Sequence, residues 1–292
     1  MPVSLSNISW HQNGSKRLSY AVLFFQTLFT ILALYNIKEP VSIPFIKLPF
    51  AIAILAALYF LPKPFYHPVF WASLLAYFSI LLVKDFYGVA NHHFAACYIL
   101  IALIQYTAGS RPDDDLLKFH IRFILMMVLL LSAVQKFLSP SYTNGTFFQF
   151  EMYMDIFLKP MKWVVPGWQN AIAENLEAYK QLKAVYPSKL ETIILREPIS
   201  HAAVIAKTGS WFAIIIEAMA GIALFAKSSH RISHVLLLAT IAGVFFFRQE
   251  TGFLAMLSCM GLLLAPAKSW RNIWLFCFIV FASMVATGAG LR

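Results

Sequence analysis

Charged residues are scarce in this chain. They make up 12% of its 292 residues, whereas hydrophobic residues make up 60% and aromatic residues 16%. Soluble domains carry roughly 25% charged residues, so the composition excludes a soluble globule and indicates an integral membrane protein. The 23 cations outnumber the 13 acids. They are scattered along the ends of apolar segments and one long loop, which favours contact with lipid headgroups over nucleic acid binding.

Cysteine is scarce as well. Cys97, Cys259 and Cys277 lie inside apolar runs without a paired spacing, which excludes a disulfide framework and a redox or zinc motif. No His-Glu-x-x-His pattern occurs, and the adjacent His92 and His93 point in different directions on a helix. No metal site is therefore predicted. The sequence also lacks an evident internal repeat, which makes a transporter the weaker interpretation.

What the chain has in plenty is apolar runs. A helix needs roughly 20 apolar residues to cross a bilayer, and the runs predict an all-α, multi-pass bundle of about nine transmembrane helices that form one domain over residues 1–292. The expected spans are residues 18–37, 48–61, 69–83, 91–109, 119–138, 211–226, 232–247, 251–266 and 272–290. Residues 139–209 have no run of spanning length. They are expected to form an extramembrane insertion with amphipathic helices on the membrane surface around residues 174–186.

The cations of the short loops predict the orientation. With a cytoplasmic N-terminus, the inner loops hold nine of them: Lys16, Arg17, Lys63, Arg111, Lys118, Lys227, Arg231, Lys268 and Arg271. The outer segments hold five: Lys38, Lys47, Lys84, Arg248 and Arg292. We therefore expect a cytoplasmic N-terminus, with the C-terminus and the insertion of residues 139–209 on the extracytoplasmic side. The outer end of the bundle would then carry Asn91, His92, Lys136 and the turn at residues 248–250.

Lys136 is the principal candidate for function. It ends the fifth expected span, one turn beyond Ser132, and a polar turn from Ser139 to Gly145 follows. A lysine at a membrane helix end is ordinarily an interfacial anchor. Withdrawal from water instead favours the neutral amine, which is a candidate general base. Both interpretations stay open at this point.

Other polar groups lie in expected spans. Asn91, Tyr98 and Gln105 are seven residues apart and form one stripe, which should face the bundle interior because hydrocarbon offers no hydrogen bonds. The stripe serves either inter-helix hydrogen bonding or a pocket. Glu217 lies within the sixth span, where a carboxylate needs a partner or a cavity. It is either a structural pair or a functional group.

Arg248 and Glu250 form the turn between the seventh and eighth expected spans. A solvated surface pair is the default interpretation of two such residues. Membership of an outward-facing pocket is the alternative.

Two segments together resemble a known family. They are NHHFAACYIL at residues 91–100, and SAVQKFL at residues 132–138 with Tyr142 and Gly145 in the turn after it. Their order and spacing are similar to those of the membrane domain of vitamin K-dependent gamma-carboxylases, within the horizontally transferred transmembrane domain family. In that family an Asn-His pair opens one helix, and a later helix ends in a lysine pair before a short polar stretch.

The resemblance implies roles for individual residues. Lys136 matches the lysine base that deprotonates the reduced vitamin K, and Gln135 stands where the family has a first lysine. His92 matches the histidine thought to assist carboxylation, with Asn91 as its neighbour. Tyr98, Gln105, Gln135, Glu217, Arg248 and Glu250 are then the candidate pocket residues.

The leading hypothesis is a carboxylase-like membrane enzyme that uses reduced vitamin K or another hydroquinone, possesses no metal, and modifies a secreted or membrane peptide on the outer face. The resemblance does not extend to the family's large lumenal domain. The alternative hypothesis is a non-catalytic membrane subunit that binds and stabilises partner proteins, or assists export or maturation of a secreted peptide. Neither hypothesis implies a nucleic acid partner.

Overall fold

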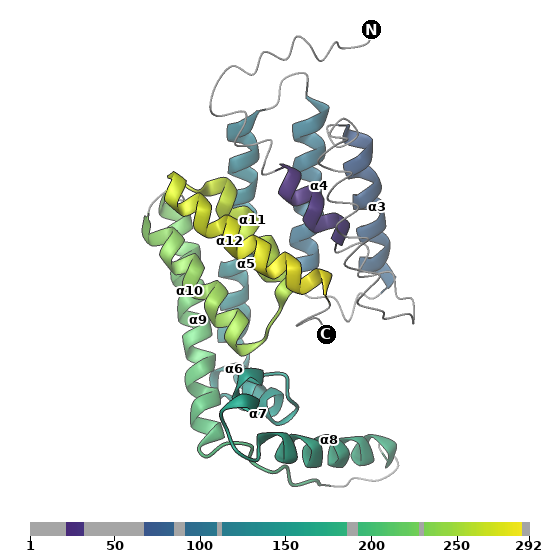
Figure 1. Cartoon of the computed structure of the whole chain (residues 1–292), viewed down its shortest axis with the longest axis vertical. Helices are drawn as coiled ribbons and strands as arrows, with labels where there is room; N and C mark the ends of the chain where they lie inside the picture. The colour runs from purple at the N-terminus through teal and green to yellow at the C-terminus, as the bar shows by residue number, and fades with distance from the viewer. Residues whose placement is uncertain are drawn as a thin grey trace. The chain divides into compact units, whose positions relative to one another are not determined.

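The chain is a membrane-embedded helical protein. The computed structural model describes residues 22–31, 67–84, 91–109, 113–185, 192–227 and 231–287, and every regular element in these ranges is a helix (Figure 1). Three described helices are long and apolar enough to cross a bilayer: Asp114–Leu138, Ala202–Ala226 and Lys268–Ala286. Shorter apolar helices cover Val22–Ile31, Pro68–Ile80, His93–Ala108, Arg231–Phe247 and Thr251–Leu264. Nine spans and their orientation stay predictions, and the second expected span lies outside the described residues.

The chain divides into two compact units. The first comprises Met1–Val128, Ala223–His234 and Thr251–Arg292, and the second comprises Leu129–Ile222 and Val235–Glu250. Three helices contribute residues to both units: α5 (Asp114–Leu138), α9 (Ala202–Lys227) and α10 (Arg231–Phe247).

In the first unit, α3 (Pro68–Lys84) packs beside α4 (Asn91–Ala108), and α11 (Thr251–Leu264) packs against α12 (Lys268–Ala286) (Figure 1). Nearly all of α11 is buried, as expected for a helix that is apolar on all sides. The close packing depends on Gly261, because a Cβ there would lie 2.6 Å from the indole ring of Trp274.

Both ends of α5 are set by local sequence. The carboxylate of Asp113 accepts hydrogen bonds from the backbone N–H groups of Asp115, at 3.1 Å, and Leu116, at 2.9 Å. These bonds satisfy donors that a helix start leaves open. The helix therefore begins before residue 119, where the apolar run starts. It ends at Leu138, since Pro140 opens the short helix α6 (Pro140–Thr143).

The insertion folds around its own core in the second unit. After α6 come α7 (Thr146–Tyr153), the 3₁₀ helix η4 (Lys159–Trp163) and α8 (Trp168–Val185), which runs across the direction of α9 (Figure 1). The core consists of Phe148, Met152, Phe157, Leu158, Trp168, Ile172, Ala202 and Ala206. The phenyl rings of Phe148 and Phe157 stack with centroids 4.3 Å apart. The expected amphipathic segment is α8, whose N-terminal half contributes Trp168 and Ile172 to this core.

Helix α9 starts earlier than the sixth expected span, which was placed at residues 211–226. Helix α9 begins at Ala202 and continues through Lys207, Thr208 and Gly209. These three residues interrupt the apolar run, which is why hydropathy placed the span start after them. A residue that breaks an apolar run need not break a helix, because lysine is a good helix former and one glycine costs only about 1 kcal/mol.

A close backbone contact ties the turn before α7 to α9. Gly145 has φ of 87°, and a Cβ at this position would lie 2.6 Å from the Cα of Lys207. Only glycine meets both requirements without strain, because it has no Cβ and accepts a left-handed φ. The turn after the end of α5 is therefore fixed against the first turns of α9.

Candidate functional site

The site begins where α5 and α9 approach each other. A Cβ on Gly221 would lie 2.7 Å from the side chain of Leu130, so the glycine lets the two helices come close. Four residues before Gly221 in α9 lies Glu217, and six residues after Leu130 in α5 lies Lys136. From Leu130 to Lys136 the residue numbers in α5 increase, while those of the contacting residues in α9 decrease from Gly221 to Glu217. The two helices are therefore antiparallel.

Lys136 and Glu217 form a buried ion pair. The amine Nζ of Lys136 donates to both carboxylate oxygens, Oε1 and Oε2. The Lys136 side chain is 16% exposed and that of Glu217 is 8% exposed. A carboxylate at this depth in an apolar helix is costly without a partner, and Lys136 is that partner.

A second ion pair network lies in the same unit. The guanidinium of Arg248 contacts Glu151 Oε1 at 3.3 Å and Glu250 Oε1 at 3.1 Å. Glu151 comes from α7, whereas Arg248 and Glu250 come from the turn after α10. Arg248 stays in the helical hydrogen-bond pattern, with its N–H donating to the Val244 carbonyl at 2.9 Å.

Tyr142 of α6 connects the two pairs electrostatically. Burial raises the pKa of its hydroxyl to about 12; Arg248 opposes this shift, and the carboxylates of Glu151, Glu217 and Glu250 add to it. All four charged groups therefore lie within electrostatic range of the Tyr142 hydroxyl, which stays protonated at neutral pH. We call the six residues Lys136, Tyr142, Glu151, Glu217, Arg248 and Glu250 the charged cluster.

Glu151 of α7 is a buried carboxylate of the charged cluster. Burial raises its pKa, Arg248 lowers it, and Glu250 raises it further. With all groups ionised, the two cations and three carboxylates of the charged cluster sum to −1, and a proton on Glu151 brings the sum to zero. Two buried atoms, Glu151 Oε2 and Arg248 Nε, have no hydrogen-bond partner among the described residues. The cluster thus retains an open acceptor and an open donor.

The remaining predicted residues lie elsewhere. Gln135 is exposed on α5. Tyr98 hydrogen-bonds across helices to His120 Nδ1 at 2.8 Å, and Gln105 lines a small cavity between α4 and α5. Asn91 and His92 open α4, but their side chains lie outside the described part of the structure. The expected proximity of these two residues to Lys136 stays a prediction.

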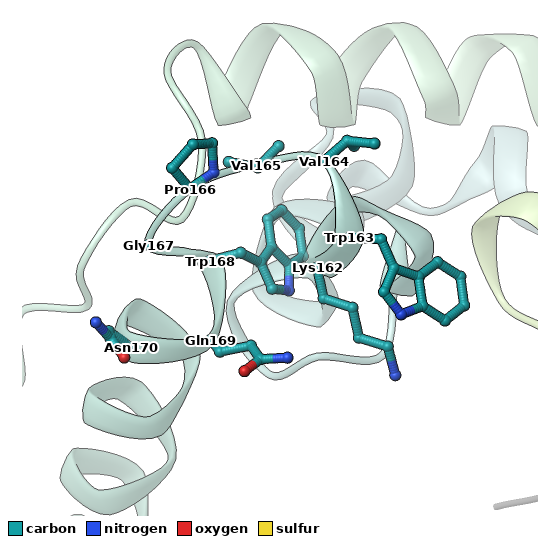
Figure 2. A pocket seen from close by; sticks show the side chains of 9 residues that line it. All are labelled: Lys162, Trp163, Val164, Val165, Pro166, Gly167, Trp168, Gln169 and Asn170. Atoms are coloured by element: carbon teal, nitrogen blue, oxygen red, sulfur yellow. The ribbon is translucent and has the colours of Figure 1, made fainter.

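An open hollow of about 360 Å³ lies in the second unit, formed by the end of η4, the start of α8 and the segment between them (Figure 2). Its lining residues all come from residues 162–170. Lys162 Nζ lies 5.0 Å from the ring centroid of Trp163, and the indole N–H of Trp168 donates to Asp155 at 3.3 Å. Because none of the charged cluster lines this hollow, we do not assign the chemistry to it.

Sequence reasoning missed Glu151 and did not assign a role to Tyr142 beyond its place in a motif. The signal for Glu151 was present, since it is a lone carboxylate in the aromatic run FFQFEMY at residues 147–153. In the described ranges, no group of three or more histidine, cysteine or acidic side chains is placed to hold a metal ion.

Comparison with known proteins does not assign a function to this geometry. No family model, no curated protein and no solved structure matches the chain. The carboxylase-like interpretation accordingly stays an expectation that depends on the two sequence motifs.

Proposed function

We propose that the chain is a membrane-embedded proton-transfer enzyme of the carboxylase-like kind, with Lys136 and Glu217 as its acid–base pair. The observation that supports it most is the two-oxygen contact between a lysine and a carboxylate inside apolar helices. Ionisable groups in such a position are rare and mark proton relays and substrate sites. Their clustering with Tyr142, Glu151 and Arg248 is typical of functional sites.

The pair can act as a base in two steps. Glu217 first takes a proton from the Lys136 ammonium, which leaves a neutral amine and a carboxylic acid. Lys136 then accepts the proton of an acidic hydroxyl on the substrate. The resulting oxyanion lies beside the re-formed ammonium, which stabilises it. Charge is conserved, because the oxyanion balances the proton that stays on Glu217.

A hydroquinone fits this donor set. Its hydroxyl is acidic enough to lose a proton to an amine, and its apolar ring suits a site between membrane helices. A bound hydroquinone would supply the acidic hydroxyl. Lys136 would remove its proton, Glu217 would hold the displaced proton, and Asn91 and His92 would orient the anion if they lie at the same end of the bundle.

The test uses the purified protein in nanodiscs with a reduced naphthoquinone, a labelled carbon dioxide source, a glutamate-containing peptide, and dioxygen, which would oxidise the hydroquinone anion to a base strong enough to take a proton from the glutamate carbon. The wild-type protein is expected to incorporate label, and the Lys136→Met variant to lose at least 99% of it. Lys180→Met, on the exposed face of α8, is the matched control and should keep wild-type incorporation. Incorporation by Lys136→Met that equals the control would refute the base role.

A second candidate function is a partner-binding membrane subunit. The insertion exposes large apolar side chains: Trp163 is 72% exposed, Val164 68% and Ile194 94%. Apolar groups left uncovered on a folded surface favour a protein interface. This function predicts a stoichiometric partner in native membranes that is lost when all three residues are changed to Ser, and no label incorporation by the wild-type protein.

A further inference from the structure

The end of the 3₁₀ helix η4 and the residue after it form an exposed apolar and basic patch in the second unit. Trp163 is 72% exposed and Val164 is 68% exposed. The amine of Lys162 lies 5.0 Å from the ring centroid of Trp163, and both side chains project from the end of η4 (Figure 2). We call Lys162, Trp163 and Val164 the η4 patch. None of the three belongs to the charged cluster, so the partner of the η4 patch is independent of the proposed function.

The backbone fixes the start of η4 beside the end of α10. The N–H of Leu158, the residue before η4, donates to the carbonyl of Phe247, the last residue of α10, at 2.9 Å. The ring of Phe157 also stacks on that of Phe247, with centroids 4.9 Å apart. The start of η4 therefore lies at the level where α10 ends.

The end of α10 is also the edge of an apolar layer. Lysine, arginine and acidic residues are absent between Arg231 and Arg248. The 17 residues of α10 extend over about 25 Å, close to the roughly 30 Å of a hydrocarbon layer. The five residues of η4, at about 2 Å each, bring Trp163 within about 10 Å of this edge. The headgroup layer beyond the hydrocarbon is about 5–8 Å thick, so the η4 patch lies at or near the headgroups.

The side chains of the η4 patch suit this layer. Tryptophan is enriched at membrane interfaces, where its ring contacts acyl chains and its N–H contacts water. A lysine can place its stem along apolar groups and its amine at the lipid phosphates. Lys162 is exposed and lies beside the exposed indole of Trp163, so the patch combines an apolar surface with a charge complementary to phosphate.

Helix α8 is less suited to lie on the bilayer. Its apolar residues Trp168 and Ile172 are buried in the core of the insertion, whereas Glu174 and Glu177 are exposed. Exposed carboxylates repel lipid phosphates. We propose that the η4 patch, rather than α8, docks on the bilayer surface. Trp163 and Val164 lie at the boundary of headgroups and acyl chains, and the Lys162 amine lies at the lipid phosphates.

The experiment measures depth by electron paramagnetic resonance of a nitroxide spin label in nanodiscs of phosphatidylcholine and phosphatidylglycerol. The label is attached to Val164→Cys in the full-length chain, with its three native cysteines replaced by alanine. Oxygen concentrates among acyl chains, whereas a neutral nickel chelate stays in water and reaches the headgroup layer less often. The ratio of oxygen to nickel collisions should be at least threefold higher at Val164→Cys than at Lys180→Cys, an exposed control position on α8.

Two variants test the other members of the η4 patch with the label kept at residue 164. Trp163→Ser removes the ring, and Lys162→Glu turns the attraction to phosphate into repulsion; each should lower the collision ratio at least twofold. Lys183→Glu, the same charge change on α8, should leave the ratio unchanged. Gel filtration of each variant checks that it remains folded.

Three results would overturn the proposal. Equal collision ratios at Val164→Cys and Lys180→Cys mean that the η4 patch faces water and is open to a protein partner. Few collisions with either reagent at Val164→Cys mean that protein covers the patch. A high ratio that neither Trp163→Ser nor Lys162→Glu lowers means that other residues hold the insertion at the membrane.

Discussion

Breaking the pair of Lys136 and Glu217 should have unequal effects depending on which partner is removed. In Lys136→Met, Glu217 stays in an apolar helix without its cation. Its side chain is 8% exposed and too short to reach water, so we expect a loss of about 3 kcal/mol in the free energy of unfolding. In Glu217→Gln, the long stem of Lys136 can carry the amine toward the interface, and the amide can still accept a hydrogen bond. The loss should be about 1 kcal/mol.

The double variant Lys136→Met/Glu217→Gln removes both charges. It should lose only about 1 kcal/mol, because no uncompensated charge remains. The single losses sum to about 4 kcal/mol, so the coupling energy of the cycle is about 3 kcal/mol. Reversible unfolding by sodium dodecyl sulfate in mixed micelles measures all four proteins. A double variant whose loss equals the sum of the single losses would contradict the pairing.

The same double variant separates structure from chemistry. It should be folded and inserted yet incorporate no labelled carbon dioxide, because it lacks the amine and the carboxylate. If it is folded and retains full biological function, the pair serves only to hold α5 against α9.

Three further outcomes are expected for the second unit. Because burial raises the pKa of Glu151, the protonated side chain stabilises the fold at pH values below the ordinary glutamate pKa, and this contribution is lost as the pH rises through the raised pKa. Glu151→Gln should flatten that loss in unfolding titrations that run upward from about pH 4, while Glu174→Gln, an exposed control, should not. Gly145→Ala should lower the free energy of unfolding by about 3 kcal/mol, because the alanine has a left-handed φ and its Cβ overlaps the α9 backbone. Gly167→Ala also has a left-handed φ, of 80°, but nothing lies within 4 Å of the added Cβ, so its loss should be about 1 kcal/mol in the same assay. Equal losses for the two variants would contradict the close contact at Gly145. A cysteine replacing the exposed Trp163 should react with an impermeant maleimide added outside intact cells. The wild-type chain is the control. Labelling of the variant only after the cells are permeabilised would reverse the predicted orientation.

Much of the helical fold could be predicted because it depends on local apolar runs. Helix α4 starts at Asn91, as the pattern of residues 91–109 indicates, and α12 covers most of residues 272–290. The starts of α5 and α9 could not be predicted. A hydropathy pattern does not detect a capping aspartate such as Asp113, or a helix that continues through a charged residue such as Lys207.

The candidate site was only partly accessible from sequence. Lys136 and Glu217 stood out singly, because charges within apolar runs are rare. Their pairing depends on the register of α5 against α9, which Gly221 and Leu130 set through a contact between distant parts of the chain. The burial of Glu151 could be recognised only in the folded insertion, since it comes from tertiary packing rather than from the neighbouring residues in the sequence.

The 81-residue separation of Lys136 from Glu217 also constrains how the protein is made. At a synthesis rate of 5–20 residues per second, roughly 4–16 s pass between the two residues leaving the ribosome. During that interval α5 must reside at the translocon or in the bilayer with an unpartnered amine. Because Lys136 lies near the helix end, its stem can hold the charge at the headgroups until Glu217 arrives. We therefore expect the lysine to serve first as an interfacial anchor and then, once α9 has been inserted, as one half of the ion pair.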